Sequence, residues 1–338
     1  MVTIYDVARR AGVSAATVSR VFNGISVSPA RADAVHKAAA ELGFVRNRNA
    51  RRLRTSLSEI VAMMVPDIEN PFFSVMTRAV EDVVRAEGYS VMLCNTDEDF
   101  DREQTYLRVA VAETVAGVIV VPSSDAIDLN PVIERGLPVV CVDRRAPGYD
   151  VDTVVADNLD ASAQATMLLF DAGYRRIACV TGPEHVETAD ERLAGWAAAV
   201  RRGTGRDADP GLIRRARYTV EDGERATHDL LGLPDPPDAF FAANNRLAAG
   251  ILRVLSGRGQ LPPTIGVVSF GGLPLVLLAP LGVLVTNLPA RDLGLEAARL
   301  LLQRINGSDE PAQHVVLPVT IGDERSGMDQ LDGAEARW

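Results

Sequence analysis

Side chains suited to catalysis or metal binding are few in this sequence, and they are scattered. The four histidines, His36, His185, His228 and His314, share no spacing typical of a zinc site. Neither a nucleophile elbow nor a phosphate-binding glycine loop is present. The segment 184–187 places one histidine between two glutamates, and we expect a polar loop there. The pattern therefore indicates a protein that is not an enzyme and uses no metal or other cofactor.

The cysteines and the hydropathy pattern indicate where the protein works. Cys94, Cys141 and Cys179 each lie alone in an apolar run, which favours buried free thiols in a reducing compartment. The longest apolar stretch, 273–285, is too short for a membrane span and contains two prolines and a glycine. The chain opens without the pattern of a signal segment. These features predict a cytoplasmic protein with no membrane partner.

Cationic side chains that can bind a polyanion are concentrated at the amino terminus. Residues 1–54 carry ten Lys or Arg and three Asp or Glu, a balance of +7. Because the whole chain carries −10, the remainder carries −17. This split predicts a small head that contacts nucleic acid and a large acidic body that does not. Charge alone would equally fit a solvated basic helix surface, so the elements that carry these residues matter.

Three short helices are predicted in a head that spans residues 1–46. The first covers 4–11 and ends at Gly12, and Ser14 caps the second, 15–23. The third extends over about 29–42. Two helices joined by a tight glycine turn are typical of a helix-turn-helix, whose second helix enters the major groove of DNA.

Five runs in this region make the interpretation specific. They are Val2–Ala8, Ala11–Ser14, Thr17–Asn23, Leu42–Phe44 and Asn47–Arg48. Together they resemble the amino-terminal signature of the lactose-repressor (LacI/GalR) family. The resemblance implies a sequence-specific DNA-binding transcriptional regulator of the repressor type, with gene activation as the open alternative.

The resemblance also implies DNA contacts for single residues. Ala15 and Ala16 match the two main base-reading positions of the family, and Arg20 matches a third. A methyl group can contact only an apolar feature such as the thymine methyl, whereas a guanidinium can bind guanine O6 and N7 together. We therefore expect Arg20 to dominate base reading. Contacts to phosphates or the groove wall are implied for Tyr5, Ser14, Thr17, Ser19 and Asn23. The alternative for Thr17 and Ser19 is that they lie on the helix surface and make no contact with DNA.

Residues 47–58 resemble the hinge helix and linker of the family. The resemblance implies that two copies of this segment fold together in the minor groove. Leu53 matches a wedge that opens a base step, and Ala50 is small enough to let the backbone sit deep in the groove. Arg51 supplies a cation for phosphates or the narrow groove. The alternative is a basic linker whose leucine packs on the body.

Beyond the hinge, short apolar runs alternate with longer amphipathic stretches. Strands are expected at 60–65, 90–94, 115–121, 139–142 and 176–180, and helices at 72–87, 102–113, 127–135, 161–172 and 188–202. This alternation predicts parallel sheets covered by helices on both faces. The resulting fold class is an all-α helix-turn-helix head plus an α/β body.

The body is expected to contain two doubly wound parallel-sheet subdomains of periplasmic-binding-protein type. The N-terminal effector-binding subdomain is placed at 59–160, and this range is approximate because the chain crosses between the lobes. The C-terminal effector-binding subdomain is placed at 161–326, and a tail follows at 327–338. Further family runs, such as Arg175–Ala178 and Glu191–Trp196, extend the resemblance to about Ser326.

The resemblance implies that a small-molecule effector binds in the cleft between the two lobes. The implied aromatic contacts stack on a ring, and the implied charged and polar contacts bind hydroxyls or a carboxylate. The alternative role of Phe72 is packing in the core, and the alternative role of Asp157 is capping a helix. The complete set is Phe72, Phe73, Asp143, Arg144, Asp157, Arg192, Tyr218 and Asn245.

Two departures from the family leave the effector class open. Many relatives carry Asp where Asn245 stands, and relatives usually show Gly, an aromatic and two acidic residues at 269–272. A sugar, a sugar acid or a nucleoside all fit. The tail after Ser326 has no sustained heptads, which predicts a homodimer on a near-palindromic operator. The alternative, a solute-binding receptor without DNA function, would lack the basic head.

Overall fold

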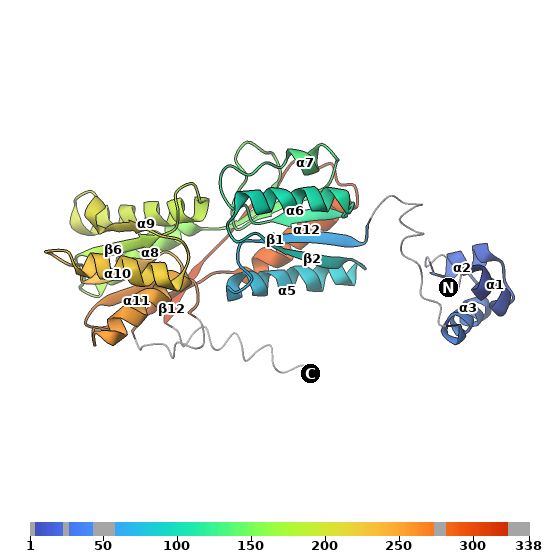
Figure 1. Ribbon diagram of the computed structural model, residues 1–338, viewed down its shortest axis with the longest axis horizontal. Coiled ribbons are helices and arrows are strands. Elements are labelled where there is room, and N and C mark those ends of the chain that lie inside the picture. The colour runs from blue at the N-terminus through green and yellow to red at the C-terminus, as the bar shows by residue number, and fades with distance from the viewer. Residues whose placement is uncertain (1–3, 23–26, 43–57, 274–281, 324–338) are drawn as a thin grey trace. The chain divides into compact units, whose positions relative to one another are not determined.

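The computed structural model describes residues 4–22, 27–42, 58–273 and 282–323 (Figure 1). Contacts divide the chain into two compact units, residues 1–57 and 58–338, and each unit is described by itself.

Three helices form the first unit, as predicted. They are α1 (Ile4–Ala11), α2 (Ala15–Phe22) and α3 (Pro29–Glu41). Gly12, at φ +66°, ends α1 in a left-handed conformation that glycine adopts without strain. Ser14 caps α2, since its Oγ accepts a hydrogen bond from the backbone N of Thr17 at 3.1 Å. Val18 on the inner side of α2 is fully buried, which leaves the opposite side of this helix for contacts outside the unit.

The first lobe of the second unit contains a six-stranded sheet of parallel strands in the order β11-β5-β4-β3-β1-β2. Its strands are β1 (Ile60–Val65), β2 (Ser90–Asn95), β3 (Gly117–Val120), β4 (Val139–Val142), β5 (Asp152–Ala156) and β11 (His314–Leu317). One face is covered by α5 (Pro71–Ala86) and α12 (Ala290–Ile305), and the other by α6 (Phe100–Ala112) and α7 (Asn130–Ile133).

The second lobe repeats this plan with the order β12-β10-β9-β8-β6-β7. Its strands are β6 (Ile177–Thr181), β7 (Ile213–Arg215), β8 (Ala239–Ala242), β9 (Gly266–Phe270), β10 (Leu284–Asn287) and β12 (Thr320–Asp323), with β12 antiparallel to β10. The helices α8 (Asn158–Asp171) and α9 (Glu187–Thr204) cover one face, and α10 (Val220–Leu231) and α11 (Asn245–Gly257) cover the other. A short 3-10 turn, η1 (Pro210–Leu212), precedes β7.

Strand β1 shows why the strands are apolar runs and do not alternate with polar residues. Val61, Met63 and Val65 face α5 and α12, whereas Ala62 and Met64 face the α6 side. Because successive side chains point to opposite faces and both faces are covered, each position is apolar. The predicted doubly wound parallel architecture is confirmed for both lobes.

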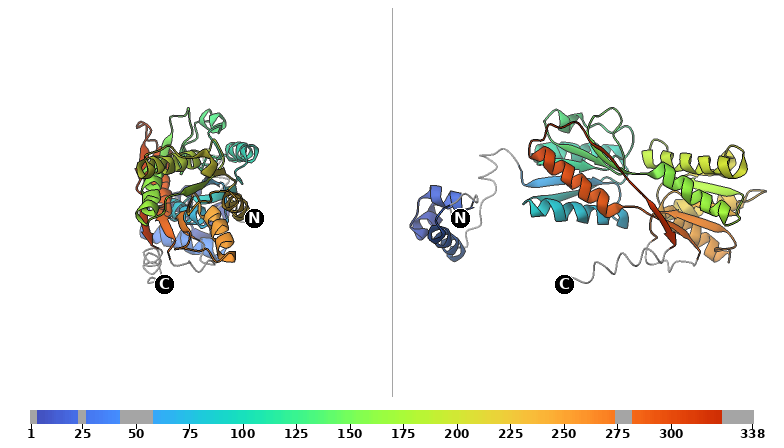
Figure 2. Two further views of the ribbon diagram at one scale, coloured as in Figure 1. Left: turned by 90° about the vertical axis from the view of Figure 1, so that its left-hand side faces the viewer. Right: turned by 180° about the vertical axis from the view of Figure 1, so that it is seen from behind.

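The chain crosses between the lobes more than once, and this corrects one expected boundary. It enters the second lobe after β5 and returns after β10, so that α12 and β11 belong to the first lobe (Figure 2). The second lobe was placed at 161–326 in an approximate division that allowed for a crossing between the lobes but did not assign 290–317 to the first lobe. The segment returns because Leu293 and Leu301 of α12 bury against the first sheet and β11 pairs with β5.

Helices α8 and α9 pack so closely that no side chain fits between them at Gly195. A Cβ atom there would collide with the carbonyl oxygen of Leu159 and the Cβ of Ser162. Since the collision involves backbone, it is not relieved by a side-chain rotation.

We therefore expect Gly195→Ala to lower the free energy of unfolding of the body by about 1–3 kcal/mol, the usual cost of overpacking. Urea denaturation followed by far-UV circular dichroism measures it. Gly257→Ala is the matched control, because a Cβ there meets nothing within 4 Å, and it should be neutral or add about 0.4–1 kcal/mol. Equal stabilities of the two variants would contradict the close packing.

Candidate functional site

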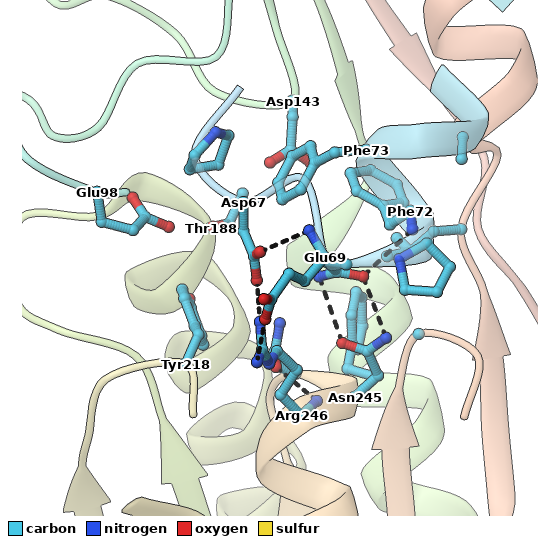
Figure 3. Close-up of a pocket in the computed structure, with 18 of the residues that line it drawn as sticks. Asp67, Glu69, Phe72, Phe73, Glu98, Asp143, Thr188, Tyr218, Asn245 and Arg246 are labelled. Atoms are coloured by element: carbon cyan, nitrogen blue, oxygen red, sulfur yellow. Dashed lines mark hydrogen bonds and ion pairs between the residues drawn. The ribbon is translucent and has the colours of Figure 1, made fainter. Parts of the chain in front are cut away.

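A cavity of about 800 Å³ lies between the two lobes. Its walls follow the carboxyl ends of β1, β2 and β4 in the first lobe and of β7, β8 and β9 in the second. Ligands of open α/β folds bind in crevices at this end of the strands. Figure 3 shows the side chains of both lobes meeting in this space.

Two adjacent aromatic side chains form one wall. Asn70 caps α5 by accepting a hydrogen bond from the N of Phe72 at 3.2 Å, and Pro71 occupies the first turn of the helix. The rings of Phe72 and Phe73 meet edge to face at 5.0 Å between centroids. Phe73 is buried in the core of the first lobe, whereas Phe72 is half-buried at its margin, and both line the cavity.

Asp143 and Arg144 directly follow β4 and are both almost completely buried. Asp143 holds a left-handed backbone at φ +68°. Its Oδ1 has no hydrogen-bond partner, and its Oδ2 lies 3.8 Å from Nε of Arg144, too far for a hydrogen bond. Burial raises the pKa of the Asp143 carboxyl, although the charges of Arg144 and Arg192 oppose this shift. Each of the two side chains thus has a buried polar atom without a hydrogen-bond partner, Oδ1 in Asp143 and Nε in Arg144.

Arg192 of α9 is the second buried guanidinium of the cavity. Its Nε donates to Oδ1 of Asn158 at 2.9 Å and its Nη1 donates to the carbonyl of Ala243 at 2.8 Å. Its plane lies over the ring of Phe270, 4.3 Å from the centroid. Burial lowers the pKa of Arg192, since no carboxylate is hydrogen-bonded to it.

Tyr218 adds a third buried polar group. Its hydroxyl, close to Thr188, makes no hydrogen bond of normal geometry, and burial raises its pKa. The tyrosine hydroxyl can both donate and accept a hydrogen bond, so it can bind a ligand hydroxyl in either role.

An amide pair joins the two lobes beside this cavity. Nδ2 of Asn245 donates to Oδ1 of Asn70 at 3.3 Å and to the carbonyl of Gly272 at 3.1 Å, while Nδ2 of Asn70 returns a long 3.5 Å contact. Asn245 stands at the start of α11, as predicted, and lines the cavity. In this arrangement its Nδ2 is engaged with protein partners.

Two arginines bridge the lobes by ion pairs. Arg246 of α11 reaches Asp67 and, at 3.3 Å, Glu69, both of the first lobe (Figure 3). In the opposite sense, Arg145 of the first lobe pairs with Glu187 and, at 3.1 Å, with Glu191 of α9. Each arginine thus binds two carboxylates of the other lobe. We call these two groups the Arg246 clamp and the Arg145 clamp.

Seven of the eight residues predicted for the effector line the cavity, and Asp157 does not. Its side chain caps α8 instead, where Oδ1 accepts from the N of Asp160 at 3.2 Å. The cause is local, because α8 begins at Asn158, earlier than the predicted 161, and its first turn needs an acceptor. The neighbouring Asn158 is the residue that contacts Arg192.

The described residues predicted for DNA binding gather on α2 and its cap. Arg20 and Ser14 are exposed, Ala15 and Thr17 are half-exposed, and Arg20 forms no ion pair with the described part of the chain. Other predicted contacts lie outside the described residues or have side chains that are not described: Tyr5, Ala16, Ser19, Asn23, Ala50, Arg51 and Leu53.

Several residues of the site were missed from the sequence. Glu98 binds Arg144 and lines the cavity, and the Arg246 clamp and the amide of Asn70 join the lobes. The only available signal was position, because Glu98 and Asn70 follow predicted strands at their carboxyl ends. Position alone does not reveal which side chain across the cleft each one meets.

Comparison with known proteins settles the family. Residues 58–322 match the model described as "Periplasmic binding proteins and sugar binding domain of LacI family", and residues 3–47 match "Bacterial regulatory proteins, lacI family". The chain belongs to the LacI family. It is 33% identical to the HTH-type transcriptional repressor CytR of Escherichia coli K12. The matched region covers 93% of this chain and 91% of CytR.

Two solved structures extend this comparison. The transcriptional regulator CelR in complex with cellobiose is 31% identical, with a TM-score of 0.70 over 95% of this chain and 98% of that one. The lac repressor dimer bound to operator and the anti-inducer ONPF is 25% identical. Its TM-score is 0.82, and the match covers 95% of this chain and 97% of that one. Within the family, this protein is a DNA-binding transcriptional regulator of the repressor type with a body built to take a small-molecule effector.

Two further observations concern the described residues alone. Their helices include none that is long and apolar enough to cross a membrane. Their His, Cys, Asp and Glu side chains form no group of three or more that could hold a metal ion.

The Arg246 clamp generates a prediction about the lobes. Arg246→Gln removes the charge that holds Asp67 and Glu69, so the distance between spin labels placed on the two lobes should lengthen and spread in pulsed electron-spin measurements. Arg253→Gln is the matched control, since Arg253 lies on the same helix but pairs with Glu224 of the same lobe. Identical distance distributions in both variants and the unmodified protein would show that the clamp does not set the lobe arrangement.

Proposed function

We propose that the protein represses transcription by binding a near-palindromic operator as a homodimer, and that a small hydroxyl-rich ligand in the cleft changes its affinity for DNA. The two heads read the two half-sites through α2. Ligand binding changes the angle between the lobes and with it the spacing of the hinges. Since the target is chromosomal DNA, the proposal places the protein in the cytoplasm, without enzymatic activity of its own.

The observation that carries the effector proposal is a group of buried polar atoms without partners on residues that line one cavity. They are Oδ1 of Asp143, Nε of Arg144 and the hydroxyl of Tyr218. A buried polar atom without a hydrogen bond destabilises a fold, so such atoms persist where a ligand satisfies them. A hydroxyl group both accepts and donates, and it matches an adjacent guanidinium donor and carboxylate acceptor. A sugar, a sugar acid or a nucleoside carries such hydroxyls.

Homodimer formation has support from a relative and from the first sheet. The lac repressor in the operator complex is a dimer. In this chain β2 is an edge strand of its sheet, and Leu93 on it is 47% exposed. An edge strand with an exposed apolar side chain is unfavourable in a lone protein unless another chain covers it.

Selection of duplexes from a random pool, with and without a panel of sugars, sugar acids and nucleosides, tests the proposed function. We expect a near-palindrome whose half-sites are related by the two-fold axis of the dimer, and one compound that shifts its binding. A selected sequence without internal symmetry would contradict the homodimer. A palindrome that no compound affects would contradict the effector proposal.

Arg20 is the residue on which base reading depends in this proposal. Arg20→Ala should cost about 1–3 kcal/mol on the selected palindrome and relax the preference at one base pair of each half-site. Arg31→Ala removes an equal charge from α3, away from the recognition helix, and should weaken binding to all sequences alike or leave it unchanged. Fluorescence anisotropy with the palindrome and its single-base variants measures both. A uniform loss in the Arg20 variant would refute its assignment to base reading.

A further inference from the structure

Arg144 is neutralised inside the cavity wall by a side chain from another loop. Its guanidinium is only 4% exposed, and Nη1 and Nη2 bind the two carboxylate oxygens of Glu98 at 2.7 and 2.8 Å. Nη1 also donates to the carbonyl of Pro122 at 2.9 Å. A two-bond guanidinium–carboxylate pair fixes both orientation and charge. Nε of Arg144 is buried without a hydrogen-bond partner, and the residue lines the cavity.

The loop that carries Glu98 is strained, and its neighbours hold it. Asp97 and Glu98 adopt φ angles of +54° and +55°, a left-handed conformation that is unusual for two consecutive residues with side chains. Arg102 forms an ion pair with Asp97, and Asp99 caps α6 by accepting from the N of Arg102 at 2.8 Å. Such strain persists only where the surroundings enforce it, and it clusters at ligand sites. Here it directs Glu98 to Arg144.

The other buried guanidinium of the cavity lacks such a partner. Arg192 is hydrogen-bonded to an amide oxygen and a carbonyl, both neutral. Asp143 lies close to Arg144 and interacts with both arginines. The two buried guanidinium groups are thus accompanied by one buried carboxyl, that of Asp143, and by the partly exposed carboxylate of Glu98. Without Glu98, the buried guanidinium of Arg144 would lose its hydrogen-bonded carboxylate partner.

We propose that Glu98 is the positioning residue that makes the cleft select uncharged, hydroxyl-bearing ligands over anionic ones. By occupying both terminal nitrogens of Arg144, it compensates the charge of the guanidinium and fills the end-on fork that would bind a carboxylate, while Nε remains a donor suited to a hydroxyl. This inference rests on the proposed effector site and narrows its ligand class to uncharged sugars and nucleosides.

The test compares ligand charge selectivity in three forms of the full-length protein without DNA. They are the unmodified chain, Glu98→Gln, and Glu87→Gln as a control that removes the same charge from the exposed end of α5. The probes are D-galactose and D-galacturonate, which differ at one carbon by a hydroxymethyl or a carboxylate. Calorimetry and thermal unfolding report both affinities.

We expect the ratio of the two dissociation constants to shift at least tenfold toward galacturonate in Glu98→Gln and to stay unchanged in Glu87→Gln. A merely structural role would weaken both sugars together and leave the ratio unmoved, which would overturn the proposal. Because the operator selection does not depend on this ratio, its failure and the failure of the proposed function are distinguishable.

A second probe makes the result independent of the sugar that the protein prefers. In Glu98→Ala the missing carboxylate leaves a space opposite Arg144, and acetate should raise the Tm of this variant more than chloride at equal ionic strength. The unmodified protein and Glu87→Ala should respond equally to the two salts. Equal responses of Glu98→Ala to acetate and chloride would overturn the proposal, and an acetate-specific rise would support it.

Discussion

The strands of both sheets are covered by helices on both faces, and this constraint decides where polar chemistry can stand. Between the strand ends nearly every side chain is apolar, as in β1, β3 and β4. The polar residues that the fold needs for recognition must therefore follow the strands. Because the strands that line the cleft are parallel within each lobe, those residues collect at one edge of each lobe, and the two edges face one cavity.

Burial of charge is the second consequence of this arrangement. A cation in the wall of a cleft loses its hydration, and the structure compensates the two arginines differently. Arg144 receives a carboxylate through both of its terminal nitrogens, whereas Arg192 receives neutral oxygens and an aromatic face. The carboxyl of Asp143 has a raised pKa, since its own burial outweighs the attraction of both arginines. The cavity thus combines groups whose protonation and pairing a ligand can alter.

The sequence was sufficient for the head and for the plan of the body, because both rest on local patterns. Gly12 and Ser14 mark the turn of the head, and apolar runs mark strands such as β1 and β4 within a residue or two. It was not sufficient for contacts across the cleft. Arg246 reads as an ordinary helix residue until Asp67 of the other lobe lies beside it. The return of α12 to the first lobe depends on burial between segments about 200 residues apart.

The role of Asp157 has a local cause instead. The resemblance implied a ligand contact for Asp157, with a helix cap as the alternative, and in the structure the side chain caps the first turn of α8. A residue that ends a strand and precedes a helix has two competing roles, and the onset of the helix decides between them. Asp143 avoids this competition because its left-handed backbone is followed by a loop and not by a helix.

The energies of the interlobe contacts fit a switch. The Arg246 and Arg145 clamps have partly exposed partners, and ion pairs of that kind contribute about 0.2–1 kcal/mol each. Coupling between sites in allosteric proteins amounts to about 1–3 kcal/mol. The contacts that hold the lobes together are thus of the same order as the differential binding of a ligand. If the lobes were joined by a large apolar interface instead, a small molecule could not shift their arrangement. In the proposed switch, weak polar clamps around the cavity therefore allow a bound ligand to shift the arrangement of the lobes.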